Sequence, residues 1–325
     1  MNRDPTFDGV VPHLRPMCTC APGHQGGAMT SCAPPDPLPY HRLALRADRP
    51  RWWRPIVVLA LGVVLFVAGA ILLAGPLVLL GEAVPDLQGR IDDVLGDGDP
   101  SDPLAATYLL LAVALMLPAA LLAVRLAGRR SPGTLSSVTG RLRWPLLARC
   151  LGAALVLMLS AMLVMLTVED GWSDAAVTDR TLPFLALAVL VVPLQAAAEE
   201  YFFRGVLMQT VGAWLRHPAF AIVLPVALFT LGHDYDVLGL IDVTAFGLAA
   251  GWLVWRTGGL EAAIGLHVAT NALIFAFGGL GLVDLAATEG TPGGLAASLT
   301  VTGLFTWLVR DWADAPSYVS AQRLP

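Results

Sequence analysis

Long apolar segments alternate with short polar connections along most of the chain. Charged or turn-forming residues delimit eight such segments: 55–80, 104–126, 145–168, 181–215, 219–232, 237–255, 259–277 and 293–309. A helix needs about 20 apolar residues to cross the hydrocarbon core of a bilayer, and most of these segments approach or exceed that length. The pattern therefore predicts an all-α fold, a polytopic membrane helical bundle of about eight transmembrane helices.

Two of these segments depart from a simple crossing. The segment 181–215 is too long for one span, so we expect a helix that crosses the membrane and continues, or bends, past Glu199–Arg204. The segment 219–232 contains Pro225, which we expect to interrupt it, and His233 follows directly after it.

The charged residues between the segments alternate in sign. Acidic residues dominate the connections 81–103, 169–179 and 284–289. Arginines cluster before the first segment and after the second, at Arg46, Arg49, Arg51, Arg54, Arg125, Arg129, Arg130, Arg141, Arg143 and Arg149. Basic connections stay in the cytoplasm, so we expect a multi-pass protein of the cell (plasma) membrane with both termini cytoplasmic.

The composition supports a membrane location. The chain has 325 residues, of which 56% are hydrophobic and 14% charged, whereas soluble domains carry about 25% charged residues. The lipid bilayer is therefore an expected partner, and nothing in the charge pattern indicates binding to nucleic acid. All 20 basic residues are arginine, and together with the abundance of alanine and glycine this is typical of a GC-rich bacterial genome.

The two ends of the chain differ from its centre. Residues 1–50 are rich in proline, glycine and polar residues, so we expect a disordered cytoplasmic segment, and Met29 is a second candidate start. In this segment Cys18 and Cys20, with His13 and His24 nearby, do not match zinc-site spacing. The transmembrane domain is predicted for residues 51–312, and 313–325 form a short cytoplasmic tail.

Two adjacent acids and an arginine lie at the end of an apolar run, in the sequence Glu199-Glu200-Tyr-Phe-Phe-Arg204. A charge at such a position costs roughly 3 kcal/mol. On a helix, Glu200 and Arg204 lie one turn apart on the same face and can form an ion pair, which would support the site structurally. Glu199 lies about 100° around the axis and has no local cation. It is therefore the better candidate for chemistry.

Two later apolar segments also carry polar side chains. His233 ends the sequence Phe229-Thr-Leu-Gly-His, while His267 and Asn271 share one helix face at four-residue spacing. A single intramembrane histidine is about as often a packed residue bonded to a neighbouring carbonyl as it is a functional group. Polar residues in a bilayer must face one another to avoid lipid, so we expect Glu199, His233, His267 and Asn271 to line one wet cavity.

This set of groups is suited to peptide hydrolysis. Glu199, with one neutral histidine, His233, can hold and activate a water molecule. His267 and Asn271 are donors that can stabilise the oxyanion of a tetrahedral intermediate. We expect the cavity to open to the cytoplasm and to receive membrane-associated peptides or proteins.

The three motifs resemble the signature of the CPBP family, the CAAX proteases and bacteriocin-processing proteins, also called the ABI family. This family includes the type II CAAX prenyl endopeptidases. The resemblance covers about residues 182–277, and all six polar positions are present, at Glu199, Glu200, Arg204, His233, His267 and Asn271. It implies an intramembrane glutamic endopeptidase with the same assignment of Glu199 and His233 to water and of His267 and Asn271 to the oxyanion.

Three alternatives remain open. Glu199, His233 and His267 are also a possible zinc ligand set, but the chain has no His-Glu-x-x-His helix and the Asn271 amide suits an oxyanion better, so metal-free catalysis is favoured. The resemblance also allows a non-catalytic membrane scaffold or immunity protein of the same fold. A transporter would also bury such groups, but its inverted repeats are not evident here.

The remaining polar and aromatic residues have simpler interpretations. His217, Asp234 and Asp236 are predicted to be loop residues, and Asp242 and Glu261 lie near segment ends, from which they can extend to the interface. Phe202, Phe203 and Phe229 are expected to pack in the core. The residues do not specify a substrate, and because bacteria generally lack prenylation, a bacterial origin favours another membrane-associated peptide.

Overall fold

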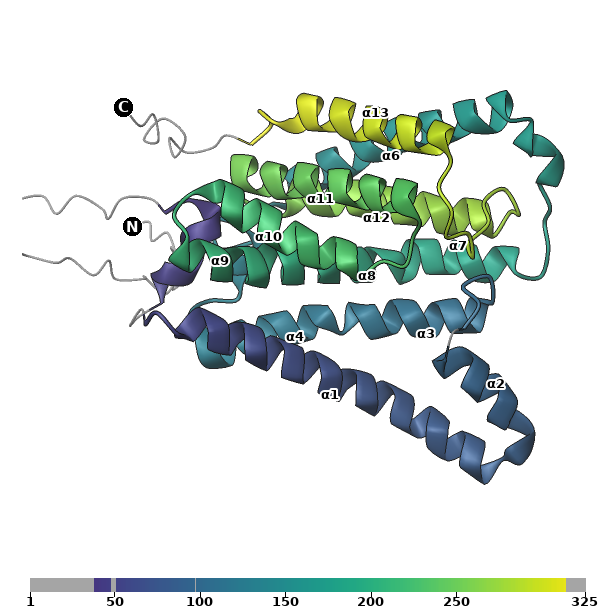
Figure 1. Ribbon diagram of the computed structural model, residues 1–325, viewed down its shortest axis with the longest axis horizontal. Helices are drawn as coiled ribbons and strands as arrows, with labels where there is room; N and C mark the ends of the chain where they lie inside the picture. The colour runs from purple at the N-terminus through teal and green to yellow at the C-terminus, as the bar shows by residue number, and fades with distance from the viewer. Residues whose placement is uncertain (1–37, 48–50, 97, 314–325) are drawn as a thin grey trace, which may run out of the picture. The chain divides into compact units, whose positions relative to one another are not determined.

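The computed structural model describes residues 38–47, 51–96 and 98–313 (Figure 1). All of them belong to one compact unit. Within the described residues the regular elements are helices, and the predicted all-α fold is confirmed. The interpretations of Cys18, Cys20 and Met29 concern residues outside the described ranges, as does most of the predicted tail.

The elements follow one another with short connections. They are η1 (Tyr40–Arg46), α1 (Arg54–Ala83), α2 (Pro85–Leu95), α3 (Pro103–Ala114), α4 (Met116–Ala123), η2 (Val124–Gly128), α5 (Gly133–Ser136), α6 (Trp144–Val168), η3 (Gly171–Asp174), α7 (Thr181–Leu190), α8 (Val192–Glu199), η4 (Glu200–Leu207), α9 (Met208–Trp214), α10 (Pro218–Leu231), α11 (Val237–Thr257), α12 (Glu261–Gly278) and α13 (Pro292–Val309).

Six continuous helices among the described residues are long and apolar enough to cross a membrane. They are α1, the run Pro103–Gly128, α6, α11, α12 and α13. The bent run from α7 to α9 can serve as a seventh span, and α10 is a shorter apolar helix. These eight apolar segments agree with the predicted number of about eight.

The long fourth segment bends, but not where the sequence predicted. Thr181–Leu190 and Val192–Trp214 meet at an angle of 42°, so the bend lies before Glu199 and not beyond Arg204. Pro193 explains the position, because its ring has no N–H to donate and crowds the preceding turn. After the bend the chain continues as one helical run, in which η4 is a π-helix.

Pro225 does not interrupt α10, contrary to expectation. The helix runs from Pro218 to Leu231 with Pro225 inside it. Such prolines are tolerated in membrane helices where neighbouring helices surround them, and α10 packs against α9, η4 and α11. Its 14 residues rise only about 21 Å at 1.5 Å per residue, which is less than the roughly 30 Å of a bilayer core.

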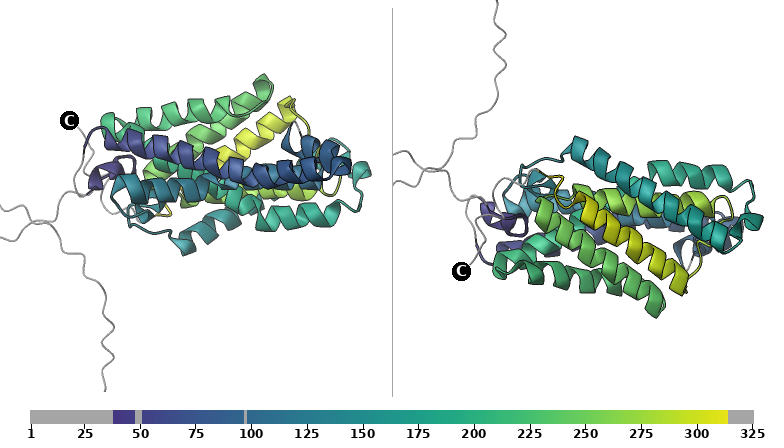
Figure 2. Two further views of the ribbon diagram at one scale, coloured as in Figure 1. Left: turned by 90° about the horizontal axis from the view of Figure 1, so that it is seen from below. Right: turned by 90° about the horizontal axis from the view of Figure 1, so that it is seen from above.

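The helix α12 lies at the centre of the packing. It contacts α6, α7, α8 and α11, while α13 lies against α11 and α6 (Figures 1 and 2). Gly265 allows α12 to approach α6 closely, since a Cβ there would stand 2.8 Å from the backbone nitrogen of Leu151 on α6. Small residues serve this purpose in membrane helices generally. The residues 261–269 are all buried, whereas 270–276 are half-buried.

Four elements lie where the sequence predicted none, namely η1, α2, α5 and η3. The helix α2 falls in the acidic connection 81–103. The short 3₁₀ helix η1 falls in the segment expected to be disordered, and it is anchored by the Tyr40 hydroxyl, which donates to the carbonyl of Leu135. The ring of His41 is 3.1 Å from the carbonyl oxygen of Arg216. Both anchoring partners are distant in sequence, so local composition does not reveal them.

Candidate active site

Glu199 and Glu200 lie at the junction of α8 and η4. Consecutive positions on a helix point about 100° apart, so the two acids face different surroundings. The Glu200 side chain is completely buried, whereas that of Glu199 is 13% exposed. Gln195, one turn earlier, donates from Nε2 to Glu199 Oε2 at 2.8 Å. Glu199 is therefore a carboxylate that is fixed by Gln195 and remains partly exposed.

Glu200 is the acceptor of a buried network. Its Oε1 accepts a hydrogen bond from Arg204 Nη1 at 2.9 Å and lies 2.8 Å from His267 Nδ1. The Arg204 guanidinium also lies over the ring of Phe229, 4.3 Å from its centroid. In the described part of the chain, Glu200 Oε2 and Arg204 Nη2 have no hydrogen-bond partner. The expected ion pair is present but incompletely satisfied.

His267 lies between the two acids. Its Nδ1 faces Glu200, and its Nε2 is 3.3 Å from Glu199 Oε2. Because both ring nitrogens lie within reach of a carboxylate, His267 links Glu199 on α8 to Glu200 on η4.

Asn271 joins this cluster through a residue that the sequence analysis missed. Its Nδ2 donates to Gln195 Oε1 at 3.1 Å, and Gln195 in turn donates to Glu199. Gln195 is buried. The signal was available, because Gln195 is a polar residue in an apolar run at four-residue spacing from Glu199.

His233 is placed near the cluster but not hydrogen-bonded to it. Its Nδ1 is 2.8 Å from the carbonyl oxygen of Phe229, and its ring lies beside those of Phe229 and Tyr235. The Phe229 ring also contacts the ring of His267. Burial is the main cause that raises the pKa of Tyr235, and the charge of Glu199 raises it further. Glu199 and the loop that carries His233 are therefore close enough to interact electrostatically.

The prediction for Glu261 is wrong. Instead of extending to the interface, its side chain is completely buried at the start of α12, where the helix dipole favours a carboxylate. Arg143 donates to Oε1 from its backbone nitrogen at 2.8 Å and from Nε at 2.9 Å, and to Oε2 from Nη2 at 2.6 Å. Arg143 also donates from Nη1 to the carbonyl of Thr257. Both oxygens of Glu261 are satisfied.

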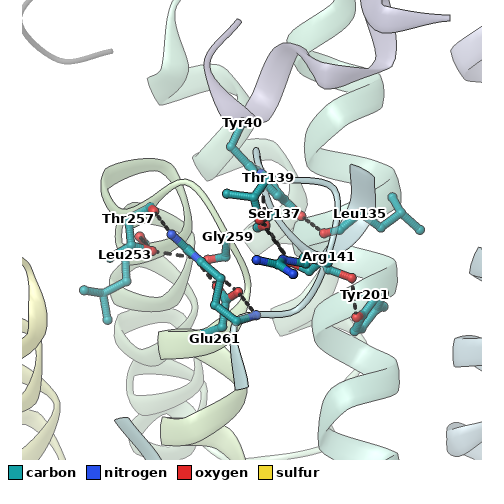
Figure 3. Close-up of polar contacts among 12 residues, drawn as sticks. Tyr40, Leu135, Ser137, Thr139, Arg141, Tyr201, Leu253, Thr257, Gly259 and Glu261 are labelled. Atoms are coloured by element: carbon teal, nitrogen blue, oxygen red, sulfur yellow. Dashed lines mark hydrogen bonds and ion pairs between the residues drawn. The ribbon is translucent and has the colours of Figure 1, made fainter. Parts of the chain in front are cut away.

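This ion pair belongs to a set of contacts that we call the clasp, made by Ser136, Ser137, Arg143, Tyr201 and Glu261. The Ser136 and Tyr201 hydroxyls are 2.7 Å apart, and Leu260 donates from its backbone nitrogen to the Ser136 carbonyl. Ser137 forms an isolated bridge with Gly259. Figure 3 shows these contacts converging around the loop that precedes α12. The clasp thus fastens the start of α12 to α5 and η4.

Other residues singled out in the sequence have structural roles. Asp236 caps α11 by accepting from the backbone nitrogen of Gly239, and it also accepts from that of Gly290. Asp242, predicted to extend to the interface, instead accepts from the Ser298 hydroxyl at 2.6 Å. His217 caps α10, Asp234 is exposed, and Phe202 and Phe203 pack edge to face.

The side chains of the candidate site are compared with the donor set that a metal ion requires. Among the described residues, no three histidine, cysteine, aspartate or glutamate side chains converge as a set that could hold a metal ion. Both ring nitrogens of His267 lie near carboxylate oxygens, at 3.3 Å from Glu199 and 2.8 Å from Glu200, so a metal ion on either nitrogen would have to displace one of these contacts.

Comparison with known proteins shows what this part of the chain resembles. Residues 180–273 match the family model described as type II CAAX prenyl endopeptidase Rce1-like, and this range contains all six motif residues. The uncharacterized protein YyaK of Bacillus subtilis (strain 168) is 26% identical over 260 residues, covering 77% of this chain and 83% of that protein. No solved structure matches the chain. The chain is thus a helical membrane protein whose residues 180–273 are similar to the Rce1-like type II CAAX prenyl endopeptidases.

Proposed function

We propose that the protein is an intramembrane endopeptidase that hydrolyses peptide bonds of membrane-associated peptides or proteins. The family match supports a protease in general. The observation that carries the specific proposal is the position of Glu199, a partly exposed carboxylate held by Gln195 next to His267. Such a group can act as a general base on water.

In the proposed mechanism Glu199 and His233 hold the attacking water. Glu199 removes a proton from the water as its oxygen bonds to the peptide carbonyl carbon, and later delivers that proton to the leaving amine as the C–N bond breaks. If His233 Nδ1–H donates to the Phe229 carbonyl, its Nε2 is unprotonated and can accept a hydrogen bond from the water. These two acceptors would orient the water for attack.

His267 and Asn271 are proposed to stabilise the oxyanion. Removal of one donor of this kind typically costs about 10²–10³ in kcat. Glu200 accepts from His267 Nδ1 and so fixes the ring, which directs its Nε2 toward the side where Glu199 lies. Asn271 has a second amide hydrogen besides the one donated to Gln195. The ion pair with Arg204 holds the Glu200 carboxylate in place.

Three alternatives rank below this proposal. A zinc ion on Glu199, His233 and His267 would supply a Lewis acid, but the contacts of His267 oppose it, so no cofactor is proposed. A non-catalytic scaffold or immunity protein of the same fold is the second candidate, and a transporter the third. The polar cluster lies entirely within residues 195–271, whereas transporters distribute such residues over both repeats.

The proposed setting is the bacterial plasma membrane, with both termini in the cytoplasm and the bilayer and a membrane-associated substrate as partners, and without nucleic acid. Arginines at one end of the bundle support this orientation. The prenylated Cys-terminal peptides of the family name are one substrate class to test among others.

The test uses Glu199→Gln and His233→Ala in proteoliposomes that contain lipid-anchored fluorogenic peptides. Loss of a general base lowers the rate by about 10²–10⁴, and we expect losses in this range for Glu199→Gln with unchanged protein accumulation. Glu289→Gln, in an exposed loop, is the matched control and should cleave normally. Wild-type cleavage rates in both site variants would refute the proposal, and loss of wild-type activity on chelation would favour the zinc alternative.

A further inference from the structure

The described residues show different exposure at the two ends of the site, and this difference bears on how a substrate enters. The inference rests on the proposed function and replaces the expectation of a cavity open to the cytoplasm. We infer that the site receives its substrate from the non-cytoplasmic side of the membrane. The substrates would then be membrane-anchored peptides or proteins whose scissile bond lies near the outer surface.

The end of the site near the clasp is closed. All residues of α12 from 261 to 269 are buried, as are Ser136, Ser137 and Tyr201 around them. The ion pair of Arg143 with Glu261 and the Ser136–Tyr201 contact fill this end with satisfied polar groups. Figure 3 shows the loop with Ser137 and Thr139 beside Gly259 and Glu261 at the start of α12. A peptide entering here would have to break the clasp.

The opposite end is more accessible. Residues 270–276 of α12, including Asn271, are half-buried although α12 is central, and Tyr235 beside His233 is 44% exposed. The short helix α10 ends at Leu231 after packing on α9, η4 and α11 (Figure 1). Because a lipid-facing asparagine is costly, the exposure of Asn271 is best explained by contact with water or a substrate.

Charge identifies which end faces the cytoplasm. The clasp lies among arginines, namely Arg129, Arg130, Arg141, Arg143 and Arg256. The accessible end adjoins acidic loops: Asp236 donates from its backbone nitrogen to the Thr288 carbonyl and accepts from Gly290, which ties the His233 loop to the loop containing Asp284 and Glu289. Since arginine-rich connections remain in the cytoplasm, the accessible end faces outward.

Thiol labelling tests the inference in cells that express the full chain. Cys18, Cys20, Cys32 and Cys150 are replaced by serine, and single cysteines are introduced as Tyr235→Cys, Asn271→Cys or Arg141→Cys. A membrane-impermeant maleimide is applied to intact cells and to inverted vesicles. We expect at least tenfold faster labelling of Tyr235→Cys and Asn271→Cys in intact cells, and of Arg141→Cys in inverted vesicles. Thr270→Cys is a second probe if Asn271→Cys does not accumulate.

Labelling of Asn271→Cys and Thr270→Cys mainly in inverted vesicles, or from neither side, would overturn the inference. These readouts do not require proteolysis, so they can fail while Glu199→Gln still abolishes cleavage. Conversely, outward labelling together with unchanged cleavage by Glu199→Gln would overturn the proposed function and leave the accessible side established. The cysteine variants thus test the side of entry, and Glu199→Gln separately tests the proposed proteolysis.

Discussion

Two buried glutamates, Glu261 in the clasp and Glu200 in the candidate site, are both completely inaccessible and both paired with an arginine. They differ in how well they are satisfied. Arg143 occupies both oxygens of Glu261 with three donors. Glu200 uses one oxygen for both Arg204 and His267, while its other oxygen and one Arg204 nitrogen are left without a partner in the described chain.

The difference distinguishes a fully satisfied structural pair from the pair that lies in the proposed site. Buried polar groups are normally hydrogen-bonded, and exceptions call for an explanation such as a catalytic role. Glu261 needs no further partner, so its purpose is to hold α12 in position. Glu200 retains unused hydrogen-bonding capacity next to two other ionisable groups, which is typical of a site that rearranges protons or binds a ligand.

The largest effect is expected for Glu261→Ala. Removing one partner of a buried ion pair typically costs about 3–5 kcal/mol because the other charge remains buried and unpaired. We expect a strong loss of folded protein, measured by size-exclusion chromatography and thermal unfolding in detergent. The double variant Arg143→Met with Glu261→Met should restore most of the lost stability. An unchanged unfolding temperature for Glu261→Ala would contradict the structural role.

Two double variants, one in the clasp and one in the site, sharpen the comparison between them. The double variant Glu200→Gln with Arg204→Met should accumulate as folded protein but lose about 100-fold in cleavage, the order of effect of losing one oriented oxyanion donor. The reason is that His267 loses the carboxylate that fixes its Nδ1–H. The Arg143→Met with Glu261→Met variant should retain cleavage. Equal cleavage by the two double variants would show that the Glu200–Arg204 pair is no more important for activity than the Arg143–Glu261 pair.

A smaller effect is expected for Gln195→Leu, which removes the link between Asn271 and Glu199. Losing a buried hydrogen-bond partner costs about 1–3 kcal/mol, and we expect kcat to fall about tenfold with little change in KM. The control is Gln209→Leu, a buried glutamine that bonds the Thr134 carbonyl away from the site. It should alter unfolding temperature but not kcat, and a similar loss of kcat in both variants would argue against a role for Gln195 in positioning.

The smallest effect concerns Asp236, in the loop that precedes α11. Hydrogen bonds from the backbone nitrogens of Gly239 and Gly290 lower the pKa of this carboxyl below its ordinary value of 3.8. A lowered pKa stabilises the folded state above pH 3.8, and the contribution is lost as pH falls through the folded-state value. Asp236→Asn should therefore unfold at a slightly lower temperature than wild type at pH 7, with a difference that shrinks below about pH 4. A constant difference across this range would contradict the assignment.

The sequence predicted the features that depend on local pattern. Apolar segments and charge alternation were sufficient for the helical membrane fold, and four-residue spacing was sufficient for the Glu200–Arg204 pair. Four-residue spacing also relates Gln195 to Glu199, and Pro193 marks the position of the bend, so both features can be read from the sequence. Roles in catalysis remain predictions.

Other features depend on partners far apart in the chain. Arg143 and Glu261 are separated by 118 positions, and nothing in either neighbourhood indicates the other. The folding of η1 likewise depends on Leu135 and Arg216. The orientation of His267 between two acids, with Glu199 rather than His233 beside its Nε2, follows from the packing of α12 against α8. Spacing within one helix cannot supply this information.

The π-helix η4 directly follows Glu199, and a π turn accommodates one more residue than an α turn. An in-frame loss of one codon within residues 200–207 would let this stretch close as an ordinary α-helix. Because the π turn already absorbs one additional residue, the later side chains would keep their direction relative to Glu199, and Thr210 and Trp214 would keep their acceptors on Pro55 and Trp52. The same loss elsewhere between Val192 and Trp214 would rotate all later side chains by about 100°, so homologues that lack one residue of this run are expected to lack it within 200–207.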